Sequence, residues 1–159
     1  MIYPHVIRLR GPWHFEVLPV GGAVAASQLS ATDLACRDDA PTSGSLPLPA
    51  DWISGVPASL HSRVCWRRRF SRPSGLDEGE AVWLCIAGRG AMLTVALNER
   101  PLAAIDASEP LRAIDVTNLL QPRNELTIEA HRPGGPCPEL QVARGDANVR
   151  LEIRRAAEQ

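Results

Sequence analysis

Apolar residues recur at every second position, or in short unbroken runs, along most of this 159-residue chain, and 14 prolines and 12 glycines separate the segments. Alternation at period two is typical of strands with one buried face, whereas a short apolar run is typical of a strand buried on both faces. The pattern predicts about eight to ten short strands and at most one or two short helical turns. The expected strands span residues 5–10, 13–20, 45–48, 64–70, 81–87, 92–98, 110–116, 124–131 and 148–153.

Each sheet must bury one of its faces, so we expect an all-β fold of two packed sheets, a β-sandwich or jelly roll, with residues 1–159 as a single domain. Two segments leave alternatives. Residues 5–10 and 13–20 flank a Gly-Pro pair, and since proline donates no hydrogen bond to a sheet, they form either two strands or one interrupted strand. Residues 23–37 are mostly small and fit either a short helix or a strand with a loop.

The clearest strand, VCWRRRF at residues 64–70, distributes its three consecutive arginines over two faces. Side chains alternate along a strand, so Arg68 shares a face with Trp66 near the rim of the core, while Arg67 and Arg69 point the other way. This separation argues against a basic patch for nucleic acid and favours ion pairs with acids on neighbouring strands. The same reading of strand patterns places three tryptophans in the core, Trp13, Trp66 and Trp83.

The stretch RAIDVTNLLQPRNEL, residues 112–126, combines acids, amides, a hydroxyl and basic residues, as an active-site loop would. Its order nevertheless indicates a turn. Asp115 and Thr117 carry side-chain oxygens that accept backbone N–H groups at the start of a helical turn, and Leu119 and Leu120 would then close the end of the sandwich. We therefore interpret the stretch as a structural clasp rather than a catalytic loop.

The charge balance argues against a polyanionic partner. The chain carries 17 basic residues, all of them Arg, and 18 acidic ones, for a net charge of -1, whereas nucleic acid and anionic lipid are bound by a surplus of basic residues. We therefore expect neither a nucleic acid nor a membrane as partner. The first ten residues, MIYPHVIRLR, lack a basic segment followed by an apolar one, so a cytoplasmic location is expected.

The histidines and cysteines indicate neither a metal site nor a disulfide framework. They form no CxxC, HxH or HExxH pair, so no transition-metal site is expected. Reduced thiols are the expectation for a chain long enough to fold without cross-links. Cys65 and Cys85 lie in strand-like runs, however, and could face each other across the sandwich. The other two cysteines are Cys36 and Cys137.

The order of several motifs resembles a known family. IRLRGPWHFEV, VCWRRRF, VALNERPL and AIDVTNLL follow one another as in the N-terminal sugar-binding domain of glycoside hydrolase family 2, and the resemblance extends from Ile7 to Ile153. It implies a galactose-binding-like jelly roll, a domain found in β-galactosidases, β-glucuronidases and β-mannosidases. Some galactose-binding-like domains carry a structural calcium, but nothing in this sequence calls for that ion or for any other cofactor.

The resemblance also reveals departures from the family pattern. Glu99 stands where the family usually has Gly, and Arg123 lies near where another Gly is usual. The acidic, aromatic-rich loop that helps line the partner domain's active site in β-galactosidase-like members is replaced by AHRPGGPCPELQVARG, with Glu139 as its only acid. The residues that match the family's structural positions are Trp66, Arg67, Phe70, Gly88, Asn98, Asp115, Thr117, Asn124 and Leu126.

In that family the two catalytic carboxyl groups, about 5 to 5.5 Å apart in a retaining enzyme, sit on a TIM barrel of about 250 residues, longer than this chain. We therefore expect no enzyme but a non-catalytic carbohydrate-binding or accessory module with an oligosaccharide ligand. Trp52 is the candidate for stacking on a sugar ring, with His61 and Arg89 as polar contacts, although Trp52 would alternatively cover the core. The alternative function is a protein-interaction or scaffolding domain, which would show an apolar patch or form a homo-oligomer.

Overall fold

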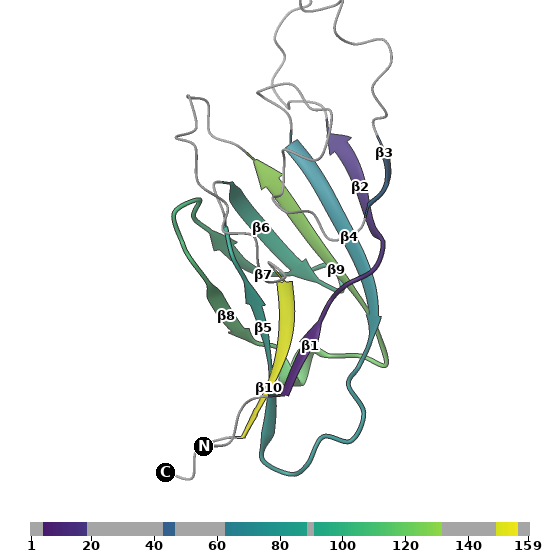
Figure 1. Ribbon diagram of the computed structural model, residues 1–159, viewed down its shortest axis with the longest axis vertical. Coiled ribbons are helices and arrows are strands. Elements are labelled where there is room, and N and C mark those ends of the chain that lie inside the picture. Colours follow the sequence, from purple (N-terminus) through teal and green to yellow (C-terminus); the bar gives the residue numbers. More distant parts are fainter. Residues whose placement is uncertain (1–4, 19–42, 47–62, 89–90, 132–148, 156–159) are drawn as a thin grey trace, which may run out of the picture.

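The computed structural model describes residues 5–18, 43–46, 63–88, 91–131 and 149–155. These residues form ten strands in two antiparallel sheets, with one 3-10 turn at Thr117–Leu119 (Figure 1). None of them belongs to a helix long and apolar enough to cross a membrane. The predicted all-β sandwich of two sheets is confirmed.

The smaller sheet has four strands in the order β1-β10-β5-β8, and the larger sheet has six in the order β3-β2-β4-β9-β6-β7. β1 and β10 are direct neighbours, with His5 opposite Ile153, so the first and last described strands pair with each other. The bounds in the smaller sheet are β1 His5–Arg8, β10 Val149–Arg155, β5 Glu80–Ile86 and β8 Arg112–Asp115. Those in the larger sheet are β3 Ser43–Leu46, β2 Trp13–Leu18, β4 Arg63–Ser71, β9 Arg123–His131, β6 Met92–Leu97 and β7 Arg100–Ile105.

The segment between β1 and β2 carries the chain from the smaller sheet to the larger one. Gly11 has a φ of 106°, which glycine adopts without strain, and a Cβ there would lie 3.0 Å from a guanidinium nitrogen of Arg68. That guanidinium donates hydrogen bonds to the carbonyls of Arg10 at 2.7 Å and Pro12 at 3.3 Å. The Gly-Pro pair therefore separates two strands in different sheets, and Arg68 secures the crossing at the rim of the core.

The core lies between the two sheets and consists of the inward-facing residues of their strands. Trp13 and Trp66 are fully buried, and the rings of Trp66 and Phe15 lie 5.6 Å apart in a tilted arrangement. The indole N–H of Trp13 donates a hydrogen bond to the carbonyl of Leu9 at 3.1 Å, so its polar atom is satisfied inside the core. Phe70 packs against the same cluster from the far end of β4.

Trp83, the third tryptophan that the strand patterns placed in the core, is not part of it. The inward-facing residues of β5 are Val82, Leu84 and Ile86, so Trp83 points to the outer face, where the guanidinium of Arg154 lies 5.0 Å from its ring centre. The prediction that Trp83 is a core residue is therefore wrong. Every residue of β5 after Glu80 is apolar, which conceals the alternation that would have revealed the outward position.

Cys65 and Cys85 are buried free thiols. Val64 and Trp66 face the core from β4, so Cys65 points to the outer side of the larger sheet, just as Cys85 points to the outer side of the smaller one. The two thiols face away from each other, which excludes the disulfide that the strand positions left open, and the expectation of reduced thiols is confirmed for this pair. Burial raises the pKa of both thiols, which keeps them protonated at neutral pH. The remaining cysteines lie outside the described residues.

The stretch that begins with β8 forms a clasp at the end of the smaller sheet. Oδ1 of Asp115 accepts hydrogen bonds from the backbone N–H of Thr117 at 2.9 Å and from its hydroxyl at 2.6 Å. The Thr117 hydroxyl in turn accepts the backbone N–H of Val82 at 2.9 Å, which joins the turn to β5. Leu120 is buried and Leu119 packs against the core beside it. The polar residues of this stretch therefore serve the fold.

Candidate functional site

The described part of the chain does not include the three residues predicted to contact a ligand, Trp52, His61 and Arg89. The strands that follow two of them begin at the same end of the larger sheet, on either side of β9, since Arg63 of β4 and Met92 of β6 both lie opposite His131. One end of the larger sheet is therefore where the segments that carry His61 and Arg89 join the described strands.

At the other end of the same sheet, the described residues line a shallow depression of about 440 Å³. β4 ends there and β9 begins there, with Ser71 opposite Arg123 and Arg69 opposite Glu125. The turn between β6 and β7 borders the depression from the side. The lining residues are Arg69, Phe70, Ser71, Asn98, Arg123, Asn124 and Glu125.

Two asparagines hold this end of the sheet together. The side-chain amide of Asn98 donates a hydrogen bond to Oδ1 of Asn124 at 3.0 Å, and its Oδ1 accepts the backbone N–H of Glu125 at 2.9 Å. Asn124 is buried, at 3% exposed, and it also accepts the N–H of Gln121 at 2.9 Å and donates to the Gln121 carbonyl at 2.7 Å. These amides tie the β6–β7 turn to the start of β9, which gives the depression a fixed wall.

The turn between β6 and β7 consists of two residues, Asn98 and Glu99, because Leu97 pairs directly with Arg100. Both have a positive φ, 51° and 66°, as a two-residue hairpin turn of type I′ requires. Asparagine tolerates this conformation, whereas glutamate does so at a cost. The departure from glycine at position 99 therefore leaves a strained residue, but Arg123, the other departure, begins β9 without a positive φ.

Charged side chains surround the depression. Nε of Arg69 lies 2.8 Å from Oε2 of Glu125, but the Arg69 side chain is 85% exposed, so this ion pair adds little to stability. Arg123 is exposed, and within the part of the chain that the structure describes, its side chain has no hydrogen-bond or ion-pair partner. Two arginines against one glutamate leave the rim with a net positive charge.

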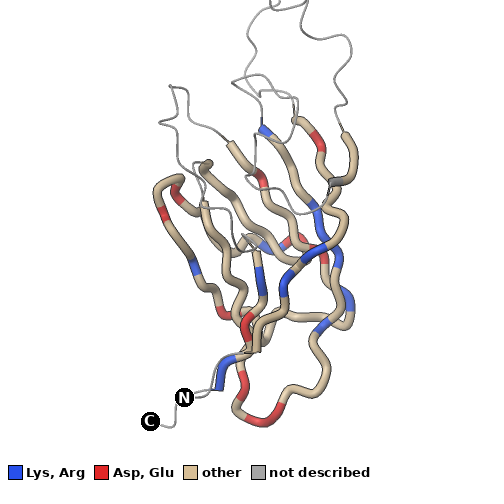
Figure 2. The backbone as a smooth tube through the Cα atoms, viewed as in Figure 1, with Lys and Arg blue, Asp and Glu red and all other residues tan. Residues whose placement is uncertain are grey.

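Two arginines of β4 are paired with acids, one on each neighbouring strand. Arg67 contacts Glu16 of β2 at 3.2 Å, while Arg69 contacts Glu125 of β9. Figure 2 shows these basic segments of β4 beside acidic segments of the adjacent strands. The basic run is therefore not a single-sign surface, as the strand alternation predicted.

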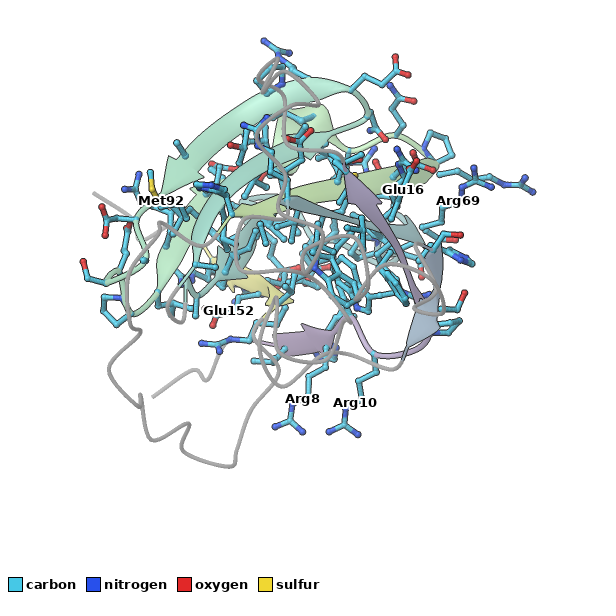
Figure 3. All side chains as sticks on the ribbon, turned by 90° about the horizontal axis from the view of Figure 1, so that it is seen from above. Arg8, Arg10, Glu16, Arg69, Met92 and Glu152 are labelled. Atoms are coloured by element: carbon cyan, nitrogen blue, oxygen red, sulfur yellow. The ribbon has the colours of Figure 1, made fainter. Side chains whose placement is uncertain are left out.

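A second charged cluster, which sequence reasoning did not single out, lies on the outer face of the smaller sheet. Glu152 is only 6% exposed and accepts hydrogen bonds from Arg150 at 2.7 Å and from Arg154 at 2.6 and 3.0 Å. Burial by itself raises the pKa of this carboxyl, but the hydrogen bonds from both guanidinium groups outweigh burial and hold the pKa below its usual range. Figure 3 shows Glu152 on the opposite side of the molecule from Glu16 and Arg69. Charges of alternating sign at every second position of β10 are the signal that could have revealed the cluster.

Acidic residues elsewhere show no metal-binding arrangement. Among the described residues, no group of three or more His, Cys, Asp and Glu side chains could hold a metal ion. Asp77 and Glu78 are exposed on the turn between β4 and β5, where Glu80 accepts the backbone N–H of Asp77 at 3.0 Å. Asp77 also lies 3.6 Å from Arg155. This acidic turn is therefore exposed to solvent.

Comparisons with known proteins concern the fold. No protein-family model matches the chain, and no curated protein matches its sequence significantly. An FMN-binding β-glucuronidase from Faecalibacterium prausnitzii L2-6 matches with a TM-score of 0.62 and 19% identity over 94% of this chain and 22% of that one. A β-glucuronidase from Bifidobacterium dentium matches with a TM-score of 0.62 and 18% identity over 96% and 30%. A rhamnosidase from Novosphingobium sp. PP1Y matches with a TM-score of 0.57 and 16% identity over 97% and 16%.

Nearly the whole chain therefore has the fold of one part of these larger enzymes. The resemblance to glycoside hydrolase family 2 that the motifs carried is confirmed at the level of the fold. The chain spans less than a third of the length of each of the three proteins.

Proposed function

We propose that this chain is a non-catalytic accessory module that binds carbohydrate. The observation that supports the proposal is the fold likeness, in which 94% or more of the chain corresponds to less than a third of each glycosidase. The enzyme from Bifidobacterium dentium was solved in complex with coumarin-3-O-glucuronide, so a sugar derivative is a ligand of that protein. An accessory role follows for a chain of this length, because the barrel that carries hydrolysis is longer than the chain itself.

The electrostatics of three of the described carboxyl groups agree with a role other than hydrolysis. A glycosidase needs a general acid whose pKa is raised so that it holds a proton at neutral pH. Three carboxyl groups, those of Asp106, Glu109 and Glu152, have a pKa that is shifted downward. Hydrogen bonds from Ser108 lower the pKa of Asp106, and those from Arg112 lower that of Glu109. All three are therefore charged at neutral pH and are unsuited to donate a proton.

The proposed sugar contacts are Trp52, His61 and Arg89. An indole ring stacks on the apolar face of a sugar, and imidazole and guanidinium groups bond to its hydroxyls. The segments that carry His61 and Arg89 lead into β4 at Arg63 and into β6 at Met92. Both strands begin at the same end of the larger sheet.

A thermal-shift screen against mono- and oligosaccharides, with and without calcium, tests the proposal. A ligand at 100 times its Kd adds about 2.7 kcal/mol, which raises the Tm of a domain of this size by roughly 5 to 10 °C. We expect one sugar class to produce such a shift and Trp52→Ala or Arg89→Ala to abolish it. Arg155→Ala, an exposed arginine at the far end of β10, is the matched control and should leave the shift intact.

Two outcomes would overturn the proposal. No shift with any sugar would leave a protein-interaction domain as the better function, for which light scattering would then reveal a specific oligomer. Turnover of chromogenic glycosides by the purified chain, retained after the sugar-binding variants, would contradict the non-catalytic role.

A further inference from the structure

Arg123 is the charged group at the depression that the fold leaves unexplained. Within the described residues its side chain contacts neither an acid nor a carbonyl, although it lies directly opposite Ser71 at the start of β9. Its backbone has no positive φ, and the related sequence pattern has a glycine nearby. Neither pairing nor backbone geometry therefore requires a guanidinium at this position.

The groups around Arg123 complete a polar site on a rigid wall. The Nε of Arg69 donates a hydrogen bond to Glu125. The two terminal nitrogens of Arg69 have no partner among the described residues. The Ser71 hydroxyl is exposed beside them, and Asn98 keeps one amide hydrogen after its bond to Asn124. All of these groups donate hydrogen bonds, and Glu125 is already neutralised by Arg69.

We propose that this depression binds a carboxylate group carried by a small polar molecule, with the Arg123 guanidinium as its main contact. A guanidinium presents a planar pair of N–H donors that matches both oxygens of a carboxylate. Phe70, between Arg69 and Ser71 on β4, also lines the depression. A volume of about 440 Å³ suits a ligand the size of one or two sugar rings, since small-molecule sites span roughly 300 to 1,000 Å³.

The carboxylate has two chemical sources, an acidic sugar or a simple carboxylic acid. Three probes distinguish them: galacturonate, which carries the carboxylate on a sugar ring, galactose, the same ring without the charge, and acetate, the carboxylate alone. The depression lies at the opposite end of β4 from the segment of His61. The two proposals are therefore tested independently. If Trp52→Ala and Arg89→Ala leave sugar binding unchanged, the proposal for Arg123 still stands, and if Arg123→Gln leaves carboxylate binding unchanged, the proposal for the loops still stands.

The measurement is an NMR titration of the full ¹⁵N-labelled chain, following the side-chain N–H signals of Arg123, Arg69 and Asn98. We expect galacturonate to shift these signals with a millimolar or tighter Kd and galactose to leave them in place. Arg123→Gln should weaken galacturonate binding at least tenfold with unchanged backbone spectra. Arg123→Lys should restore part of the binding, because it keeps the charge but loses the planar pair of donors.

The matched control is Arg63→Gln, which removes an arginine from the neighbouring strand β4 at the opposite end of the sheet and should leave the Kd unchanged. Absence of any shift would overturn the proposal, as would equal losses in Arg123→Gln and Arg63→Gln, since equal losses indicate unspecific attraction. Galactose binding as tightly as galacturonate would overturn it as well. Galacturonate binding more tightly than acetate supports an acidic sugar, and equal affinities support a site for the carboxylate alone.

Discussion

Asp115 and Thr117 form a closed pair in which one carboxylate oxygen accepts both the backbone N–H and the hydroxyl of the threonine, at 2.9 and 2.6 Å. The hydroxyl can then offer its lone pair to the N–H of Val82 at 2.9 Å, because its own hydrogen is already committed to the carboxylate. A side chain next to a strand end thereby supplies the hydrogen-bond acceptor that the sheet lacks there.

Thr117→Val should destabilise the fold, because it keeps the shape of the side chain and removes the acceptor of the Val82 N–H. A buried donor left without a partner costs about 1 to 3 kcal/mol, and urea unfolding followed by tryptophan fluorescence would measure the loss. Thr117→Ser keeps the hydroxyl and should cost less than half as much. Equal stability of the valine variant and the parent would show that the clasp does not contribute.

Asn124→Ala should be more damaging, because the buried amide makes three hydrogen bonds to Asn98 and Gln121. Loss of several buried bonds should lower the free energy of unfolding by roughly 2 to 4 kcal/mol. Asn118→Ala is the control on the nearby 3-10 turn, where an exposed residue should change stability by less than about 0.5 kcal/mol. Similar losses in both variants would contradict the role assigned to Asn124.

Glu99→Gly should stabilise the protein, which is rare for a substitution to glycine. The left-handed conformation costs a non-glycine residue about 1 to 2 kcal/mol, and the added freedom of glycine in the unfolded chain offsets about 0.4 to 1 kcal/mol of that gain. We expect a net gain of roughly 0.5 to 1 kcal/mol, measured by chemical denaturation. Arg100→Gly, one residue further on and without a positive φ, should instead destabilise. A loss of stability in Glu99→Gly would show that the glutamate makes a compensating contact.

Glu152→Gln should destabilise the protein in a pH-dependent way. The folded pKa of Glu152 lies below its usual value, so its contribution is present above the ordinary glutamate pKa of about 4.3 and is lost as pH falls through the folded pKa. At pH 7 the variant should be less stable by roughly 1 to 3 kcal/mol, because Arg150 and Arg154 lose their charged partner. Below about pH 4 the difference from the parent should narrow. Glu78→Gln, at an exposed position, is the control and should change stability at pH 7 by less than about 0.5 kcal/mol. A constant difference for Glu152→Gln from pH 7 to pH 3 would refute the ion-pair account.

Much of the fold could be predicted because its signals are local. The split of Arg67, Arg68 and Arg69 over two faces follows from alternation within one strand, and the clasp at Asp115 follows from side-chain oxygens that cap a turn two residues away. Gly11 and its proline neighbour predicted an interruption between two strand-like segments, and the structure shows that these segments are two strands in different sheets.

The misses have an equally specific cause. The prediction places Trp83 on the wrong face because the residues from Ala81 to Ile86 are all apolar, so hydrophobicity alone does not reveal which of them point outward. The depression could not be predicted because it depends on register: Arg123 and Ser71 are opposite each other across two strands far apart in sequence. The only local trace of this site was Arg123 standing near where a glycine is usual.

The pairing of His5 with Ile153 brings the two ends of the described fold onto one edge of the smaller sheet. A short linker could join them, and the chain could be reopened at the exposed turn around Gly75, where a side chain would meet nothing within 4 Å. Every strand pairing would survive this circular permutation, since neither point lies within a strand. For the same reason, the sandwich could be inserted into a surface loop of a host protein without forcing the two ends of that loop apart.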